Sequence, residues 1–248
     1  MRFINLASSS SGNCYWIELE RSSGIPVKLM VEAGIPYREI VSKSLKEKLK
    51  LADLDAVLIT HGHRDHCVSA KALADRGMRV YGNQFVCSSF REQLYPDTLK
   101  VIAPDTYVVP FKVEHDAPDS FGYVIFTDTE KILFVADNKF WKADLSSQAF
   151  DYIIIEANYD GQVMHFAIES ARESCDEAKE EQYRRVISSH LSLKNCEKQL
   201  LKLNLSKCKA IFLIHLSDRH SNENLFKSTI QDSTHVQTFV CKKNGGML

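Results

Sequence analysis

The chain has 248 residues, of which 44% are hydrophobic and 25% charged, and it carries a formal net charge of −1 at pH 7. This length can bury a sizeable core, and we expect one domain over residues 1–248. Because the net charge is near zero, the protein has no overall positive potential that would attract nucleic acid. A phosphate polymer would therefore have to bind in a local groove. No apolar stretch reaches the length of a membrane span, which excludes a membrane partner.

The cysteines and the N-terminal residues favour a cytoplasmic protein. Seven cysteines are scattered without a Cys-x-x-Cys spacing, which argues against a zinc ribbon and a secreted disulfide framework. The segment 1–6 enters a strand-like pattern and shows no charged leader or cleavage site.

The predicted elements alternate along the chain. The first half predicts helices near 36–49, 70–76 and 84–94, and strands over 3–6, 14–18, 27–31, 56–59 and 79–81, with a serine-rich loop at 8–13. The second half predicts helices over 164–185, 192–203 and 224–230, and strands near 100–102, 107–113, 122–126, 132–135, 152–156, 210–214 and 235–240. Two strand-rich halves with helices outside predict an α/β fold, a four-layer αββα sandwich of two mixed β-sheets.

A histidine and aspartate cluster follows the strand predicted over 56–59. Residues Thr60–His66 read THGHRDH, which places four imidazole or carboxylate side chains within six positions. Strand side chains alternate between faces, but a tight loop at Gly62 can gather them. A chance histidine-rich surface loop is the alternative, and the buried strand before it disfavours that interpretation. The spacing predicts two metal ions, one on each of two pairs: His61 with His63, and Asp65 with His66.

Other candidate ligands come at the ends of predicted strands or after apolar runs. Such positions can meet at one rim of a sandwich. Each residue also has a plainer interpretation, because a single histidine is often exposed or hydrogen-bonded and Asp137-Asn138 is good turn chemistry. His220 is an alternative ligand to its neighbour His215. The candidates are His115, Asp137, His190 and His215.

The motif THGHRDH resembles the HxHxDH signature of the metallo-β-lactamase fold. Further segments resemble the WalJ/YycJ-like branch of that fold, described as single-domain 5′-to-3′ DNA exonucleases and related to the catalytic domains of ribonuclease Z and ribonuclease J. These segments are LASSSSGNC at 6–14, HDAPDSFGY at 115–123, and the HLS segments at 190–192 and 215–217. The resemblance covers nearly the whole chain and implies the four-layer sandwich of that fold.

The resemblance implies a role for each candidate. The first metal ion would be bound by His61, His63 and His115. The second would be bound by Asp65, His66 and His215, with Asp137 bridging both. His190 would contact the scissile phosphate or protonate the leaving oxygen, aligned by Glu156. The substrate phosphate would also contact Asn13 and Ser11 of the serine loop. The catalytic residues would therefore be Asp65, His190 and Glu156.

The chain departs from the family pattern around this ligand set. Glu32 stands where the family has an aspartate that supports a ligand histidine. The segment 156–160 lacks a histidine of the family, Ser9 replaces a glycine, and a charged helix at 177–182 replaces a proline-rich turn. Arg184 and Arg185 could touch a phosphate backbone, but a solvated helix face is the simpler interpretation. The ligands are thus intact, whereas the rim that selects the substrate is altered.

These residues predict a hydrolase with two divalent ions, either zinc or manganese, with iron as a further candidate. Two ions about 3.5–4 Å apart can clamp both oxygens of a displacement and lower the pKa of water to roughly 7, so hydroxide is available at neutral pH. We expect a phosphodiesterase that acts on nucleic acid as a 5′-to-3′ DNA exonuclease. A small cyclic nucleotide is the second expected substrate. A thioester or lactone hydrolase and a non-catalytic metal-bound module are further alternatives, and a homodimer is common in this fold.

Overall fold

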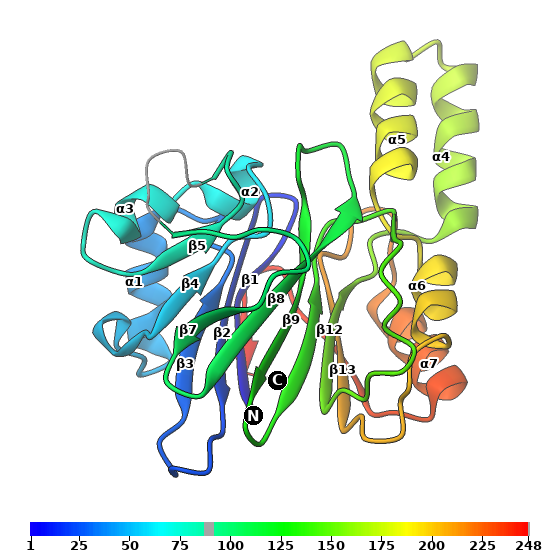
Figure 1. Ribbon diagram of the computed structural model, residues 1–248. Helices are drawn as coiled ribbons and strands as arrows, with labels where there is room; N and C mark the ends of the chain where they lie inside the picture. The colour runs from blue at the N-terminus through cyan, green and yellow to red at the C-terminus, as the bar shows by residue number, and fades with distance from the viewer. Residues whose placement is uncertain (87–91, 248) are drawn as a thin grey trace.

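The computed structural model describes residues 1–86 and 92–247, which form two facing β-sheets with helices on their outer sides (Figure 1). The first sheet is antiparallel from β15 through β1 and β2 to β3, and parallel from β3 to β6. Its strands, in sheet order, are β15 (Gly246–Met247), β1 (Arg2–Ser9), β2 (Gly12–Leu19), β3 (Val27–Val31), β4 (Ala56–Leu58), β5 (Val80–Gly82) and β6 (Glu92–Gln93).

The second sheet is also mixed, because β10, β12, β13 and β14 run parallel while the strands before them are antiparallel. Its strands, in sheet order, are β11 (Phe140–Trp141), β8 (Thr106–Glu114), β9 (Phe121–Thr127), β10 (Lys131–Val135), β12 (Tyr152–Glu156), β13 (Ala210–Ile214) and β14 (Thr238–Val240), with β7 (Lys100–Ala103) paired to β8. The predicted αββα sandwich of two mixed sheets is confirmed.

The helices cover the outer faces of both sheets. Against the first sheet lie α1 (Tyr37–Lys46) and α3 (Ala70–Ala74), with a 3₁₀ turn at Leu51–Asp53 and the one-turn helix α2 (Arg64–Cys67) at the upper rim (Figure 1). Against the second sheet lie α6 (Leu193–Leu200) and α7 (Glu223–Thr234). Between the sheets, buried aromatic side chains from both, such as Tyr15 and Phe134 with ring centroids 5.7 Å apart, form the inner core. Within the described residues, none of the helices has the length and apolar character required to traverse a bilayer.

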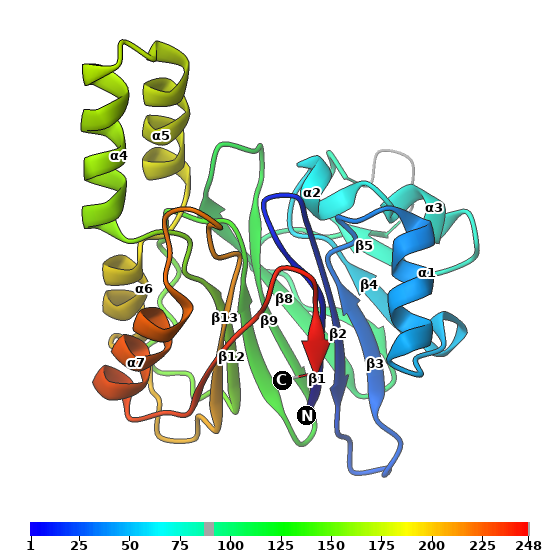
Figure 2. The ribbon, with the colours of Figure 1, turned by 180° about the vertical axis from the view of Figure 1, so that it is seen from behind.

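The helix predicted over 164–185 is wrong in its length, because it is a pair of helices. The chain reverses between α4 (Gly161–Glu173) and α5 (Glu177–Ser189) with Cys175 in the left-handed region at φ 54°. The two helices lie side by side and extend beyond the ends of the sheets in both views (Figures 1 and 2). Asp176 caps α5, since its side chain accepts a hydrogen bond from the Lys179 amide. Asp176 was the local sequence signal that a new helix begins here, but the pattern of charged residues continues across it and so suggested one long helix.

Two further predictions need correction. The helix predicted near 84–94 is wrong for the described part of that range. Residues 84–86 form a turn and β6 occupies Glu92–Gln93, while 87–91 lie outside the described residues. Asn83 Oδ1 accepts hydrogen bonds from the amides of Phe85 and Val86, a geometry that favours a turn over a helix. The serine loop is also mostly strand, since β1 and β2 pair as far as Ser9 opposite Gly12.

Candidate metal centre

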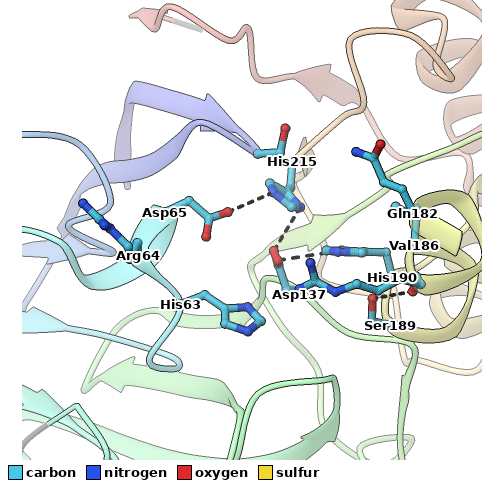
Figure 3. A pocket seen from close by; sticks show the side chains of 11 residues that line it. His63, Arg64, Asp65, Asp137, Gln182, Val186, Ser189, His190 and His215 are labelled. Carbon is cyan, nitrogen blue, oxygen red and sulfur yellow. Dashed lines mark hydrogen bonds and ion pairs between the residues drawn. The ribbon is translucent and has the colours of Figure 1, made fainter. Parts of the chain in front are cut away.

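The candidate ligands converge at the upper rim, where several strands end. His61 and His63 follow β4 in the loop that leads into α2, and Asp65 lies on α2 itself. His115, Asp137 and His215 directly or closely follow β8, β10 and β13, because the ends of these strands lie at the same edge of the sandwich. In Figure 3, His63 and Asp65 from the first half face Asp137, His190 and His215 from the second half. The structure therefore brings both halves of the chain together around one site.

The first group consists of His61, His63 and His115, whose ligand atoms lie within 4.8 Å of one another. His63 Nδ1 and His115 Nε2 are 3.2 Å apart. His115 Nδ1 lies 2.8 Å from the Ser189 carbonyl oxygen, to which it can donate a hydrogen bond. The Nε2 atom of His115 is then the nitrogen that faces the other two histidines. These are the three residues that the resemblance assigns to the first ion.

The second group consists of Asp65, His66, Asp137 and His215, also within 4.8 Å of one another. His66 Nε2 lies 3.3 Å from Asp137 Oδ1. The other oxygen of Asp137 lies 3.8 Å from His115 Nε2 in the first group. Asp137 therefore stands between the two groups, where a bridging carboxylate would have to lie.

These donors fit divalent ions. Within the described residues, His61 Nε2 and His215 Nε2 are buried and have no hydrogen-bond partner. A buried polar atom without a partner is costly, and an imidazole nitrogen can bind a metal instead. Burial also lowers the pKa of His61 well below its usual value, which keeps the ring neutral as a ligand. Imidazole and carboxylate donors together suit zinc, manganese and iron.

Two buried residues of the first half of the chain, Glu32 and Thr60, support two of the ligand histidines through hydrogen bonds and close contacts. His61 Nδ1 lies 2.9 Å from Thr60 Oγ1, which in turn donates to Glu32 Oε1 at 2.5 Å. The same Glu32 oxygen lies 3.4 Å from His66 Nδ1. The glutamate that replaces the family's aspartate thus faces the His66 ring directly and reaches the His61 ring through Thr60, so this departure from the family pattern does not leave the two rings unsupported.

Glu156 supports the ligands from the opposite sheet. Its Oε1 accepts hydrogen bonds from His190 Nδ1 at 2.7 Å and from His215 Nδ1 at 2.9 Å. Its Oε2 accepts from the backbone amides of Asn138 and Leu191. Because Glu156 is fully buried, it can act on a substrate only through the residues it holds, whereas His190 lines the cavity itself.

The serine hairpin contributes differently from the expectation. Asn13 is buried under the ligands, where its Nδ2 donates to the Ser9 carbonyl oxygen at 3.0 Å and lies 3.2 Å from His66 Nε2. Ser11 is exposed and lines neither of the cavities at the site, whereas Ser10 lines both. Of this hairpin, Ser10 is the residue best placed to contact a substrate.

A cavity of about 330 Å³ lies in front of the ligands, and its lining includes side chains to which the sequence analysis assigned no role (Arg64 and Gln182) and one that it weighed as a phosphate contact (Arg185). Arg64 and Gln182 line it, and so does Arg185, which donates from Nε to Asp116 Oδ2 at 2.5 Å. Arg184 points elsewhere, because its guanidinium pairs with Glu180 on the same helix at 2.8 Å. The helical pattern alone could not tell which arginine faces the cavity.

Raising the pH should destabilise the metal-free protein. Burial lowers the pKa of His215, but Asp137 and Glu156 outweigh it and raise this pKa to about 10. Because the pKa of His215 is higher in the folded than in the unfolded protein, protonation of His215 stabilises the fold. This stabilisation is complete below the unfolded pKa of about 6.5 and is lost as the pH rises through about 10. The melting temperature of chelator-treated protein should therefore fall between pH 7 and pH 10.

A change of His215→Gln should reduce this pH-dependent fall, whereas His165→Gln, at an exposed histidine on α4, should leave it unchanged. A melting temperature that stays level or rises over this range in the metal-free protein would contradict the expected ion pairs. With metal bound, the fall should be smaller, because a divalent ion takes the place of the protons on these ligands.

The chain is similar in sequence to a known family and to named proteins. The family model described as "Beta-lactamase superfamily domain" matches residues 35–191. Exodeoxyribonuclease WalJ of Streptococcus pneumoniae serotype 2 is 27% identical over 92% of this chain and 86% of its own. Exodeoxyribonuclease YycJ of Bacillus anthracis is 22% identical over 84% of this chain and 88% of its own.

Solved structures show the same fold at low sequence identity. The metallo-beta-lactamase fold protein YhfI from Bacillus subtilis superimposes with a TM-score of 0.70 at 14% identity and covers 99% of this chain and 98% of its own. The short form of human tRNase Z superimposes with a TM-score of 0.62 at 16% identity and covers 88% of this chain and 94% of its own.

Proposed function

Because the chain belongs to the beta-lactamase superfamily, we propose that it hydrolyses phosphodiester bonds in nucleic acid, as a 5′-to-3′ DNA exonuclease. It is a metal-dependent hydrolase, as the superfamily match and the metal-ligating clusters show. The observation that carries the proposal is the convergence of two ligand groups on Asp137, beside a cavity lined by His190. The relatives named exodeoxyribonuclease support DNA as the substrate.

We propose one divalent ion, zinc or manganese and alternatively iron, on each ligand group. Ions held there would neutralise the charge of a phosphodiester and supply an ionised water at neutral pH. The cytoplasmic location indicated by the scattered cysteines is part of the same proposal.

The surrounding residues orient the substrate and handle the proton. His190 donates from Nδ1 to Glu156, which leaves its Nε2 as the atom that can hold a proton for the leaving oxygen. Within the described residues, the guanidinium of Arg64 has no hydrogen bond or ion pair, so this cavity-lining cation is available for a phosphate oxygen. Glu156 and Glu32 hold the rings in place.

A small cyclic nucleotide is the second candidate substrate, and the net charge of −1 favours it because long polymers are usually held by basic surfaces. A single phosphodiester would also fit the cavity of about 330 Å³.

Assays of the purified protein with added manganese or zinc separate these candidates. We expect mononucleotides to be released from the 5′ end of 5′-phosphorylated DNA, with no turnover of a generic lactone, and chelation should abolish the release. RNA of the same sequence and a 3′-phosphorylated DNA test sugar preference and polarity. Turnover of cyclic mononucleotides without cleavage of DNA would overturn the first candidate in favour of the second.

A further inference from the structure

A second cavity, of about 430 Å³, adjoins the first and extends away from the ligands. The two cavities share Ser10, Gln182, Val186, His190 and His215, so a molecule in one can continue into the other. The wall that belongs to the second cavity alone is made by Asn158, by Tyr183 on α5 and by the segment 216–220 that follows His215. Asn158 donates from Nδ2 to the carbonyl oxygen of the candidate ligand His215 at 2.9 Å, whereas Tyr183 and Arg219 form no hydrogen bond with a candidate ligand within the described residues.

Arg219 gives this wall a positive charge. Within the described residues its guanidinium has no hydrogen bond or ion pair. The neighbouring carboxylate of Asp218 pairs with Lys243 instead. Burial, and then the charge of Arg219, lower the pKa of His220, so that ring is neutral at pH 7. The guanidinium is thus free to bind an anion such as a phosphate.

Tyr183 gives the same wall a flat apolar surface. Its ring meets the His220 ring edge to face, with centroids 5.0 Å apart at 79°. On the side of α4 it packs against the buried cluster of Tyr159, Met164 and Ile168, which holds it in place. An aromatic ring beside a free arginine is a common arrangement for binding a base and its phosphate.

We propose that the second cavity binds the nucleotide next to the scissile phosphate, with its base or sugar against Tyr183 and its own phosphate on Arg219. This inference rests on the proposed function. It follows that the enzyme prefers substrates with at least two phosphates in a row. A cyclic mononucleotide or an isolated phosphodiester occupies only the first cavity and offers Arg219 no group to bind.

The test compares Arg219→Ala with Arg184→Ala, a matched control because the guanidinium of Arg184 already pairs with Glu180 outside both cavities. On a 5′-phosphorylated oligonucleotide, Arg219→Ala should lower kcat/KM by roughly tenfold or more, through KM, and reduce the salt dependence of binding by about one phosphate contact. On bis(4-nitrophenyl) phosphate, which has a single phosphate, both variants should match the wild type.

Binding to the metal-free protein gives a second readout. In the presence of a chelator, the Kd of a 3′-labelled oligonucleotide, measured by fluorescence anisotropy, should rise about tenfold for Arg219→Ala and for Tyr183→Leu, and stay unchanged for Arg184→Ala. Equal losses on both substrates, or no loss on the oligonucleotide, would overturn the second-cavity proposal while leaving the proposed function in place. Failure of the wild-type protein to cleave any phosphodiester would overturn the proposed function itself.

Discussion

Replacing His63 by alanine should abolish hydrolysis while leaving the fold intact. His63 Nδ1 lies 3.2 Å from His115 Nε2 in the first ligand group, and its ring is only partly buried. Losing a ligand should reduce activity by more than the roughly 10- to 100-fold typical when a residue that only supports a ligand is changed. Elemental analysis should show less bound metal per chain, and the melting temperature of the metal-free protein should change little.

His165→Ala is the control for this experiment. His165 lies on the exposed side of α4, where its Nε2 pairs with Glu169 at 3.2 Å, and it belongs to neither ligand group. Metal content and activity of this variant should equal those of the wild type. Wild-type activity in His63→Ala would rule out a mechanism that depends on the first ligand group.

Replacing Gly34 by alanine should disrupt the ligand loop from behind. A Cβ atom at this position would overlap the backbone carbonyl of Asp65 and lie 2.7 Å from the His66 amide nitrogen. Because backbone atoms cannot rotate away as a side chain can, α2 would have to shift with both of its ligands. We expect a loss of about 3 kcal/mol or more in the free energy of unfolding, together with weaker metal binding. Denaturant unfolding and metal titration measure the two effects.

Gly62→Ala is the matched control, because Gly62 lies in the same ligand loop but a Cβ there would meet no heavy atom within 4 Å. This variant should keep most of its stability and its metal affinity. Equal effects at both glycines would show that backbone flexibility of the loop, and not the close approach of Gly34 to Asp65, is what the site requires.

Much of the fold and of the candidate site could be predicted before the structure was known. Apolar runs predict the buried strands over 56–58 and 152–156, and the THGHRDH motif places four candidate ligands in one loop. These signals are local, so they do not depend on distant residues. The residues assigned by resemblance to the two ions are the same ones that the structure groups, although their roles stay a prediction.

The elements that the sequence did not predict depend on contacts between distant segments or on very short local signals. The two-residue strand β15 exists only because it pairs with β1 at the other end of the chain. The reversal between α4 and α5 is marked in sequence by a single capping aspartate. Short elements of this kind carry too few residues to show a period, so tertiary pairing decides them.

The sequence by itself determined the layered α/β architecture and the chemistry of the ligand loop, because strand periodicity and a compact motif are properties of neighbouring residues. Only the tertiary structure decided that Glu156 holds His215 as well as His190, that Ser10 rather than Ser11 reaches the cavities, and that Arg219 and Tyr183 form part of a second cavity wall. The direction and partners of a side chain depend on what packs against it, and those neighbours come from segments far away in the chain.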